Sequence, residues 1–366
     1  MVENKLSSKI EGEEYLVLHE FAKKAKAKLS KETWDYLIGA AETETTFKRN
    51  RFALDSLAFR PRVLRDVENV DISTNLLGHV LRMPVILAPI GSMQDFVEGA
   101  GIAPTIAASE FGILHMISST CMPGLEQVAK SVNYPKLFQL YVRGDENWVD
   151  EQIKSAIDHS YAGICLTVDL DAYGRRERDL AKRYRTTSRQ SASGFEYQMR
   201  FSWKDIDRIK SYCDLPIIIK GIATKEDALL ALEHGVEVIY VSNHGGRQLD
   251  FGVGGLNVLP EIIEVVENKA KIIFDGGIMR GTDVLKAIAL GADCVGIGRL
   301  QGFAAAAGGS KAILRMLELL ETEILTGLRL LGLNSLSELD QTYLSKDYAF
   351  DSKNVLSAFP LIDEGY

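Results

Sequence analysis

The sequence predicts an α/β fold, a (β/α)8 TIM barrel with an N-terminal helical extension. Short apolar runs recur eight times along the chain, and each run ends in polar or glycine residues. Segments with helical spacing separate these runs. Eight units of similar size, over roughly the length of a typical barrel, favour a closed barrel over the alternative, a doubly wound sheet.

The predicted extension comes first in the chain. Residues 13–25 place apolar side chains at helical spacing, and a second helix is expected after Ser30, an N-cap candidate with Glu32 in its first turn. Residues 58–82 are expected to be irregular, because proline, aspartate and glycine interrupt them.

The predicted strands follow from about residue 83. The segment 224–233 is a good helix between two of them, and residues 310–331 are strongly helical and would complete the eighth unit. The eight apolar runs are 84–89, 113–118, 137–142, 163–168, 216–220, 238–242, 271–275 and 293–298.

No low-complexity segment or obvious linker divides the chain. We therefore expect a single domain over residues 1–366, made of a helical segment over about 1–82, the barrel over about 83–331 and a C-terminal tail.

Composition excludes several classes of function. A net charge of −8 argues against a nucleic-acid partner, which needs a basic face, and against an anionic membrane surface. The four cysteines are scattered without metal-ligand spacing, which predicts no metal site and suits a reducing cytosol. No signal peptide and no apolar run of membrane-spanning length is evident, so the expected location is cytoplasmic.

The segment Val241–Asp250 is the most informative part of the sequence. It follows an apolar strand, at the position where barrels carry their chemistry. His244 and Arg247 lie three positions apart, so one can act as a base while the other binds an anion, and Gly245 and Gly246 let the chain turn between them.

Asp169 ends the fourth predicted strand and has two possible roles. Its carboxylate can orient the imidazole of His244 and stabilise the protonated form, or it can cap the following helix; the sequence leaves both open. The other five histidines are read as structural.

A phosphate site is expected after strands seven and eight. Asp275-Gly276-Gly277 follows one strand and Gly296–Arg299 follows the other, and barrels often bind phosphate there. No GxGxxG motif follows an early strand, so a mononucleotide is favoured over a nicotinamide dinucleotide.

Together these motifs closely resemble those of the FMN-dependent 2-hydroxy-acid oxidase and dehydrogenase family. The resemblance extends from about Tyr15 to about Leu339. Its strongest segments are 138–141, 167–169, 174–177, 242–248, 275–277 and 298–299.

The resemblance implies catalytic, substrate-binding and cofactor-binding roles for particular residues. It implies His244 as base, oriented by Asp169, with Tyr141 and Arg176 as further catalytic residues. Arg247, Arg176 and Tyr36 would bind the substrate carboxylate, and Tyr141 would donate a hydrogen bond to the substrate. FMN would contact the cofactor-binding set Pro89, Ile90, Gly91, Ser118, Gln139, Thr167, Lys220, Ser242, Asp275, Gly276, Gly277, Arg280, Gly298 and Arg299.

The activity implied is oxidation of a small L-2-hydroxy acid, lactate-like, to the 2-oxo acid. The electron acceptor is oxygen or another acceptor, and the proton leaves from Cα or from the hydroxyl. The resemblance also implies a homotetramer or larger assembly. A non-redox flavin-dependent isomerase and a non-catalytic flavin-binding protein are the alternatives.

Three positions depart from the family pattern. Gly91 replaces an alanine beside the flavin, which leaves the choice between oxidase and dehydrogenase open. Thr120 replaces an aromatic residue and leaves the side-chain preference open. Met279 replaces an arginine, although Arg280 follows, so phosphate binding is expected to depend more on Arg299.

Overall fold

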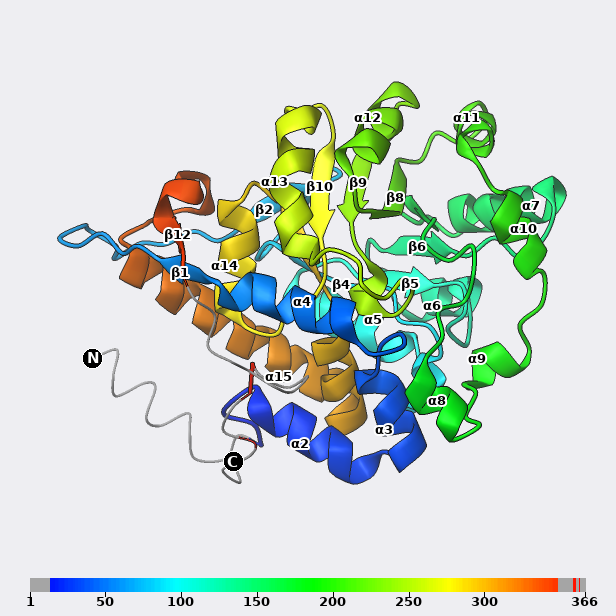
Figure 1. The fold of residues 1–366 in the computed structure, drawn as a ribbon, viewed down its shortest axis with the longest axis horizontal. Coiled ribbons are helices and arrows are strands. Elements are labelled where there is room, and N and C mark those ends of the chain that lie inside the picture. Colours follow the sequence, from blue (N-terminus) through cyan, green and yellow to red (C-terminus); the bar gives the residue numbers. More distant parts are fainter. Residues whose placement is uncertain (1–13, 348–357, 360–361, 363–366) are drawn as a thin grey trace.

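The computed structural model describes residues 14–347, 358–359 and 362, and its centre is a closed barrel of eight parallel strands (Figure 1). Seven neighbouring pairs form a continuous ladder, and the backbone N–H of Leu87 donates to the carbonyl of Leu114 at 3.0 Å to close it. The predicted barrel is confirmed, and each predicted apolar run overlaps one strand, although β8 extends two residues beyond its run. The strands are β4 (Val85–Leu87), β5 (Met116–Ser118), β6 (Leu137–Leu140), β7 (Ile164–Thr167), β8 (Ile217–Ile222), β9 (Val238–Val241), β10 (Lys271–Phe274) and β11 (Cys294–Ile297).

The strands are buried along almost their whole length, as expected when helices cover the outside of a parallel sheet. The predicted helix 224–233 is observed, with Thr224 as its N-cap. The helices between the strands are α5 (Ile102–Phe111), α6 (Leu125–Ser131), α7 (Glu146–Asp158), α11 (Trp203–Lys210), α12 (Lys225–Glu233), α13 (Gly255–Val266) and α14 (Gly281–Ala289).

The last helix is longer than expected. Helix α15 (Arg299–Leu331) begins directly after β11 and not at residue 310. Gly308 and Gly309 leave helical geometry inside it, and Gly309 has a φ of 67°. The helix therefore has two parts, since glycine adopts this backbone without steric cost.

The N-terminal extension is helical, with α2 (His19–Lys28), α3 (Lys31–Ile38) and α4 (Thr45–Asp55). Of the predicted helical stretch 13–25, the described part is helical from His19 onward. Helix α2 packs against α15, and Figure 1 shows both at the same side of the barrel. The Ser30 side chain accepts a hydrogen bond from the Thr33 N–H, as a cap at that position should.

Residues 58–82 are less irregular than expected. Strand β1 (Leu57–Phe59) pairs with β12 (Leu344–Lys346), and β2 (Thr74–Leu76) pairs with β3 (His79–Leu81). Leu77 and Gly78 both have positive φ, which is typical of a two-residue hairpin turn. Three-residue strands are too short to produce a pattern in the sequence.

A long connection after β7 lies at the cavity side of the barrel; we call residues 177–200 the roof segment. It contains α8 (Glu177–Ala181), α9 (Thr187–Gln190) and α10 (Phe195–Arg200). The Asp95 carboxylate, in the 3-10 helix η1 (Met93–Asp95), accepts a hydrogen bond from the Thr187 N–H at 2.9 Å. This contact ties α9 to the loop after β4.

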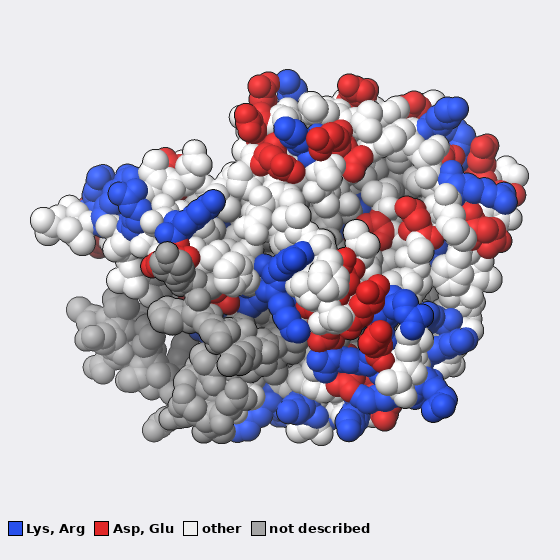
Figure 2. Space-filling model, in the orientation of Figure 1, with Lys and Arg blue, Asp and Glu red and all other residues white. Residues whose placement is uncertain are grey.

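The remaining short elements are η2 (His244–Gly246), η3 (Leu336–Glu338) and η4 (Gln341–Tyr343). All four cysteines are free and buried. On the face drawn in Figure 2, acidic and basic side chains lie interspersed. Within the described residues, no helix is long and apolar enough to cross a membrane.

Candidate active site

A cavity opens at the carboxyl ends of the barrel strands, and its volume is about 1290 Å³ with its mouth included. The N-terminal extension and the roof segment supply further walls, so residues far apart in sequence meet there. Fourteen of the predicted site residues line it: Tyr36, Pro89, Ile90, Gly91, Tyr141, Arg176, Lys220, His244, Arg247, Asp275, Gly276, Gly277, Gly298 and Arg299. The others, which lie behind these walls or point away, are Ser118, Gln139, Thr167, Asp169, Ser242 and Arg280.

His244 is fixed by contacts on one side of its ring. Its Nδ1 lies 2.8 Å from Asp169 Oδ1, and because a carboxylate only accepts, Nδ1 carries the proton and donates. Its Nε2 lies 3.4 Å from the Tyr141 hydroxyl. The ring nitrogen that faces Tyr141 and the cavity is therefore the one that can accept a proton.

Burial keeps the imidazole of His244 neutral. Burial lowers the pKa of His244, and the Asp169 carboxylate raises it only in part. Burial raises the pKa of Asp169, but its electrostatic interaction and hydrogen bond with His244 outweigh that effect and leave the pKa lowered. The pair therefore combines a neutral imidazole with an ionised carboxylate, as a general base and its orienting group require.

Two arginines and Tyr36 form a cationic wall beside His244. Arg247 Nη1 donates to the Tyr36 and Gly39 carbonyls at 2.7 and 2.8 Å, and its guanidinium lies 4.6 Å from the centre of the Tyr36 ring. Arg176 donates to the Tyr173 hydroxyl and lies 5.7 Å from the Tyr36 ring. Burial and the charge of Arg176 lower the pKa of Arg247, so an anion bound between the two would be stabilised.

Lys220, Ser242 and Asp275 form a polar group at the ends of β8, β9 and β10. Lys220 Nζ donates to Ser242 Oγ at 2.8 Å and lies 3.3 Å from Asp275 Oδ2, while Ser242 Oγ donates to Asp275 Oδ1 at 2.6 Å. Burial lowers the pKa of Lys220, but Asp275 and Asp169 more than compensate. A permanent positive charge therefore lies at the cavity wall.

Two buried polar side chains beneath the cavity lack partners. Neither amide atom of Gln139 nor the Thr167 hydroxyl has a hydrogen-bond partner within the part of the chain that the structure describes. Gln139 lies within β6 and Thr167 ends β7, and both strands are fully buried. Because buried polar groups are nearly always paired, these atoms indicate a bound group with donors and acceptors on one edge, such as a flavin ring.

Arg299 begins α15 in the region where a phosphate was expected. Its Nη2 donates to the Gly39 carbonyl at 2.7 Å, and its guanidinium lies 4.2 Å from the Phe47 ring. Burial, together with the nearby charge of Arg247, lowers the pKa of Arg299 to about 9. A bound anion would stabilise the charged form of Arg299. Glycines at the ends of β10 and β11 would let backbone N–H groups approach such an anion.

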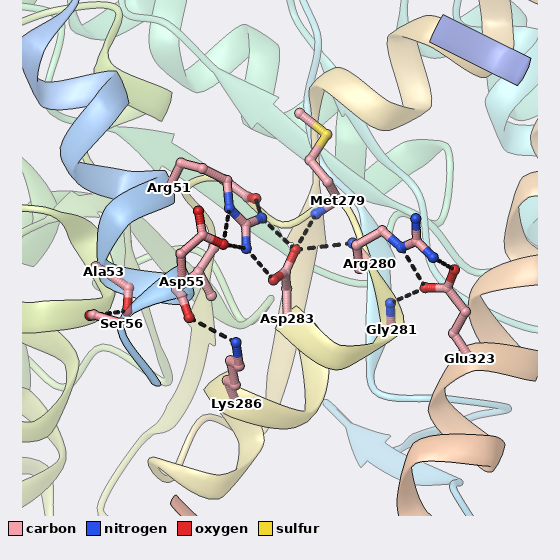
Figure 3. A network of polar contacts seen from close by, with 12 residues as sticks. Arg51, Ala53, Asp55, Ser56, Met279, Arg280, Gly281, Asp283, Lys286 and Glu323 are labelled. Carbon is pink, nitrogen blue, oxygen red and sulfur yellow. Dashed lines mark hydrogen bonds and ion pairs between the residues drawn. The ribbon is translucent and has the colours of Figure 1, made fainter. Parts of the chain in front are cut away.

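Arg280 does not line the cavity, and its side chain points to Glu323 instead (Figure 3). Its guanidinium pairs with Glu323 on α15 at 2.6 Å, while its backbone N–H and that of Met279 donate to Asp283. Met279, not Arg280, lines the cavity. The arginine after the glycines thus anchors a loop to α15 in this structure.

Arg51 on α4 was not recognised from the sequence. It binds Asp283 through both terminal nitrogens at 2.7 Å and donates to the Gly277 carbonyl at 3.1 Å. These contacts hold the glycine turn after β10. No sequence pattern marks Arg51, because its partner lies 232 positions away.

The lining residues that were not predicted include Arg143, Tyr173, Arg189 and Phe195. Arg143 lies two positions after Tyr141, which was a usable signal. Thr120 also lines the cavity, and a Cβ at Gly91 would lie 2.5 Å from its hydroxyl. The two departures from the family pattern are therefore coupled, since an alanine at 91 would require Thr120 to move.

The chain is similar to known proteins along most of its length. The family described as FMN-dependent dehydrogenase matches residues 25–346. Glycolate oxidase 3 of Arabidopsis thaliana is 37% identical over 93% of this chain and 98% of its own length. L-lactate oxidase of a Nostoc species is 34% identical, over 89% and 97%. A crystal structure of mandelate oxidase with 3,3-difluoro-2-hydroxy-3-phenylpropionic acid has a TM-score of 0.85 at 32% identity, over 92% and 100%.

Proposed function

The chain belongs to the FMN-dependent dehydrogenase family and is an FMN-dependent oxidoreductase, and from this premise we propose that it oxidises an L-2-hydroxy acid to the 2-oxo acid with His244 as base. The observation that carries the proposal is the neutral His244, which presents Nε2 next to Tyr141 and beside two buried arginines.

The substrate carboxylate binds between Arg176 and Arg247. A guanidinium binds a carboxylate through two parallel hydrogen bonds. Two guanidinium groups therefore fix the orientation of the acid and direct its C2 toward the reacting groups. Tyr36 closes this end of the cavity, because its ring packs against both guanidinium groups.

His244 Nε2 takes up the proton that leaves the substrate, from Cα or from the hydroxyl. Asp169 then stabilises the imidazolium without becoming protonated. Tyr141, whose pKa burial raises, stays protonated and donates a hydrogen bond to the substrate oxygen. Arg176 adds positive charge where that oxygen becomes more negative.

FMN, when bound, supplies the acceptor for the hydride equivalent. Gln139 and Thr167 would hold the edge of its ring, and Lys220 would stabilise negative charge on it. Arg299 and the turns after β10 and β11 would hold its phosphate.

The substrate is proposed to be small and lactate-like, with oxygen as one possible acceptor. Support comes from the names of relatives, glycolate oxidase of Spinacia oleracea among them. The cytoplasm is the proposed compartment because four free cysteines suit a reducing environment, although one relative is named peroxisomal. The proposed assembly is a homotetramer or larger.

The test mixes the purified holoprotein anaerobically with a panel of L-2-hydroxy acids that includes glycolate and lactate. Bleaching of the oxidised flavin band is expected with at least one acid, and admitting air reports on oxygen as acceptor. The His244→Ala variant should keep the yellow flavin and reduce it about 100-fold to 10,000-fold more slowly, the usual contribution of a general base.

His159→Ala is the matched control, because His159 lies at the end of α7 and bonds only its own helix through Nδ1. It should reduce flavin at the unmodified rate. Flavin that no 2-hydroxy acid bleaches, or a His244→Ala protein as fast as the control, would contradict the proposal.

A further inference from the structure

The cavity walls carry more positive charge than one carboxylate and one phosphate require. Asp275 is the single acidic residue among the described residues that line it. The basic residues there are Arg143, Arg176, Arg189, Lys220, Arg247 and Arg299. Lys220 is paired with Asp275, Arg176 and Arg247 are assigned to the substrate carboxylate, and Arg299 to the phosphate. Two arginines are left without a ligand.

Arg143 follows β6 and packs near the ring of Tyr141, which also stacks with His244. The Tyr141 and His244 rings stack with centres 6.3 Å apart, and the Arg143 guanidinium lies 5.6 Å from the Tyr141 ring and 4.4 Å from that of Phe195. Its Nη1 donates to the neighbouring Val142 carbonyl at 2.9 Å. Burial lowers its pKa, so an anionic partner would stabilise it.

Arg189, on α9 of the roof segment, shares the Tyr173 ring with Arg176. Its guanidinium lies 3.6 Å from the Tyr173 ring, and that of Arg176 lies 4.3 Å from the same ring. Asp179 is buried nearby, and burial raises its pKa. Within the described residues, neither Arg143 nor Arg189 has a carboxylate oxygen within 4.0 Å of its side-chain nitrogens.

We propose that the substrate is a 2-hydroxy acid whose side chain ends in a second carboxylate, and that Arg143 and Arg189 bind this carboxylate. The proposal rests on the proposed oxidation of an L-2-hydroxy acid, and it replaces the small, lactate-like side chain by a longer one that ends in an anion. One aromatic ring separates each arginine from a residue of the reaction centre, so the side chain would contain a few carbon atoms. Thr120 in the cavity wall leaves room for such a chain.

The test compares two acids of equal chain length, L-2-hydroxyglutarate and L-2-hydroxypentanoate, which differ by the second carboxylate. The holoprotein should oxidise the dicarboxylic acid with the higher kcat/KM. Arg143→Met and Arg189→Met should each raise KM for L-2-hydroxyglutarate about tenfold, the effect of losing a charge-assisted hydrogen bond, and leave L-2-hydroxypentanoate unchanged.

Arg185→Met is the control, because Arg185 is an exposed arginine of the roof segment that does not line the cavity. A native preference for L-2-hydroxypentanoate would overturn the proposal. An equal loss for both acids in the Arg143 and Arg189 variants would also overturn it, since the arginines would then act by packing on Tyr141 and Tyr173.

Binding of the products gives a readout that needs no turnover. Perturbation of the flavin spectrum by 2-oxoglutarate and 2-oxopentanoate measures both dissociation constants. Tighter binding of 2-oxoglutarate that depends on both arginines supports the anion site. If no acid is oxidised, that result contradicts only the proposed function. Oxidation of lactate or glycolate, with no discrimination between L-2-hydroxyglutarate and L-2-hydroxypentanoate, would contradict only the anion site.

Discussion

The hydrogen bond between His244 and Asp169 sets both the position and the protonation of the base. Asp169 accepts from Nδ1 and thereby fixes which ring nitrogen faces the cavity. It also raises the pKa of His244 against the opposing effect of burial. One contact thus controls the tautomer and the pH range in which the imidazole works.

At the same scale we predict the pH dependence of flavin reduction. Since the pKa of His244 is lowered from 6.5 and the base must be neutral, the rate should be constant near neutrality and fall as pH decreases through a pKa below 6.5. In Asp169→Asn this fall in rate should move to lower pH, because the carboxylate that raises the pKa of His244 is gone. The plateau should also fall, because the tautomer is no longer fixed. Stopped-flow reduction across pH tests this, and a limb above 6.5 in the native protein would contradict it.

Between elements, the Arg51–Asp283 contact joins α4 to the turn that follows β10 (Figure 3). Arg51 also binds Asp55 on its own helix, at 2.6 Å. Asp283 in turn accepts from the Met279 N–H. The N-terminal extension therefore fixes a loop whose residues line the cavity.

We predict that removing this contact lowers both the free energy of unfolding and the affinity for FMN. Arg51→Met would leave Asp283 buried and without its cation, which costs about 3–5 kcal/mol of unfolding free energy. The dissociation constant of FMN should rise, since Gly277 loses a hydrogen bond that holds its loop. Lys48→Met, an exposed position on the same helix, is the control. Urea unfolding and flavin fluorescence measure both quantities, and a variant as stable as the control would contradict the prediction.

The elements that sequence could predict are those with long, repeated patterns. The eight barrel strands are apolar runs in a regular series, and Ser30 caps its helix through a local contact. The hairpin of β2 and β3 was missed because three-residue strands show no period. The orientation of Arg280 was beyond prediction, because it depends on Glu323, 43 positions later on another helix.

The residues of the site likewise fall into some that the sequence predicted and some that it did not. Strand-end residues such as His244 and Lys220 were found because a parallel barrel gathers all its carboxyl ends at one rim. Arg189 was not found, because its place in the wall depends on how the roof segment folds back over that rim. Arg143 was overlooked although it follows the end of β6 closely.

For the whole molecule we predict a loss of stability in acid that originates at the opposite end of the barrel from the cavity. His115, just before β5, is buried next to Thr105, whose hydroxyl donates to the Gly101 carbonyl and so accepts from His115 Nδ1. Burial lowers the pKa of His115 to about 3. The unfolded chain therefore binds one more proton than the folded chain between pH 6.5 and about 3.

Stability should thus fall with decreasing pH in this window, by up to about 1.4 kcal/mol per pH unit from His115 alone. Urea unfolding at several pH values and one fixed FMN concentration measures the slope. His115→Gln should flatten it, and His159→Gln, at the end of α7, should not. Equal slopes in the two variants would contradict the assignment.

The burial of all four cysteines has a consequence for an enzyme that would hand electrons to oxygen. Burial raises the pKa of every one of these thiols, that of Cys121 to about 12. Peroxide attacks thiolates, and at neutral pH these side chains would be almost entirely protonated as well as shielded. If hydrogen peroxide is its product, these four thiols would be poor targets for it.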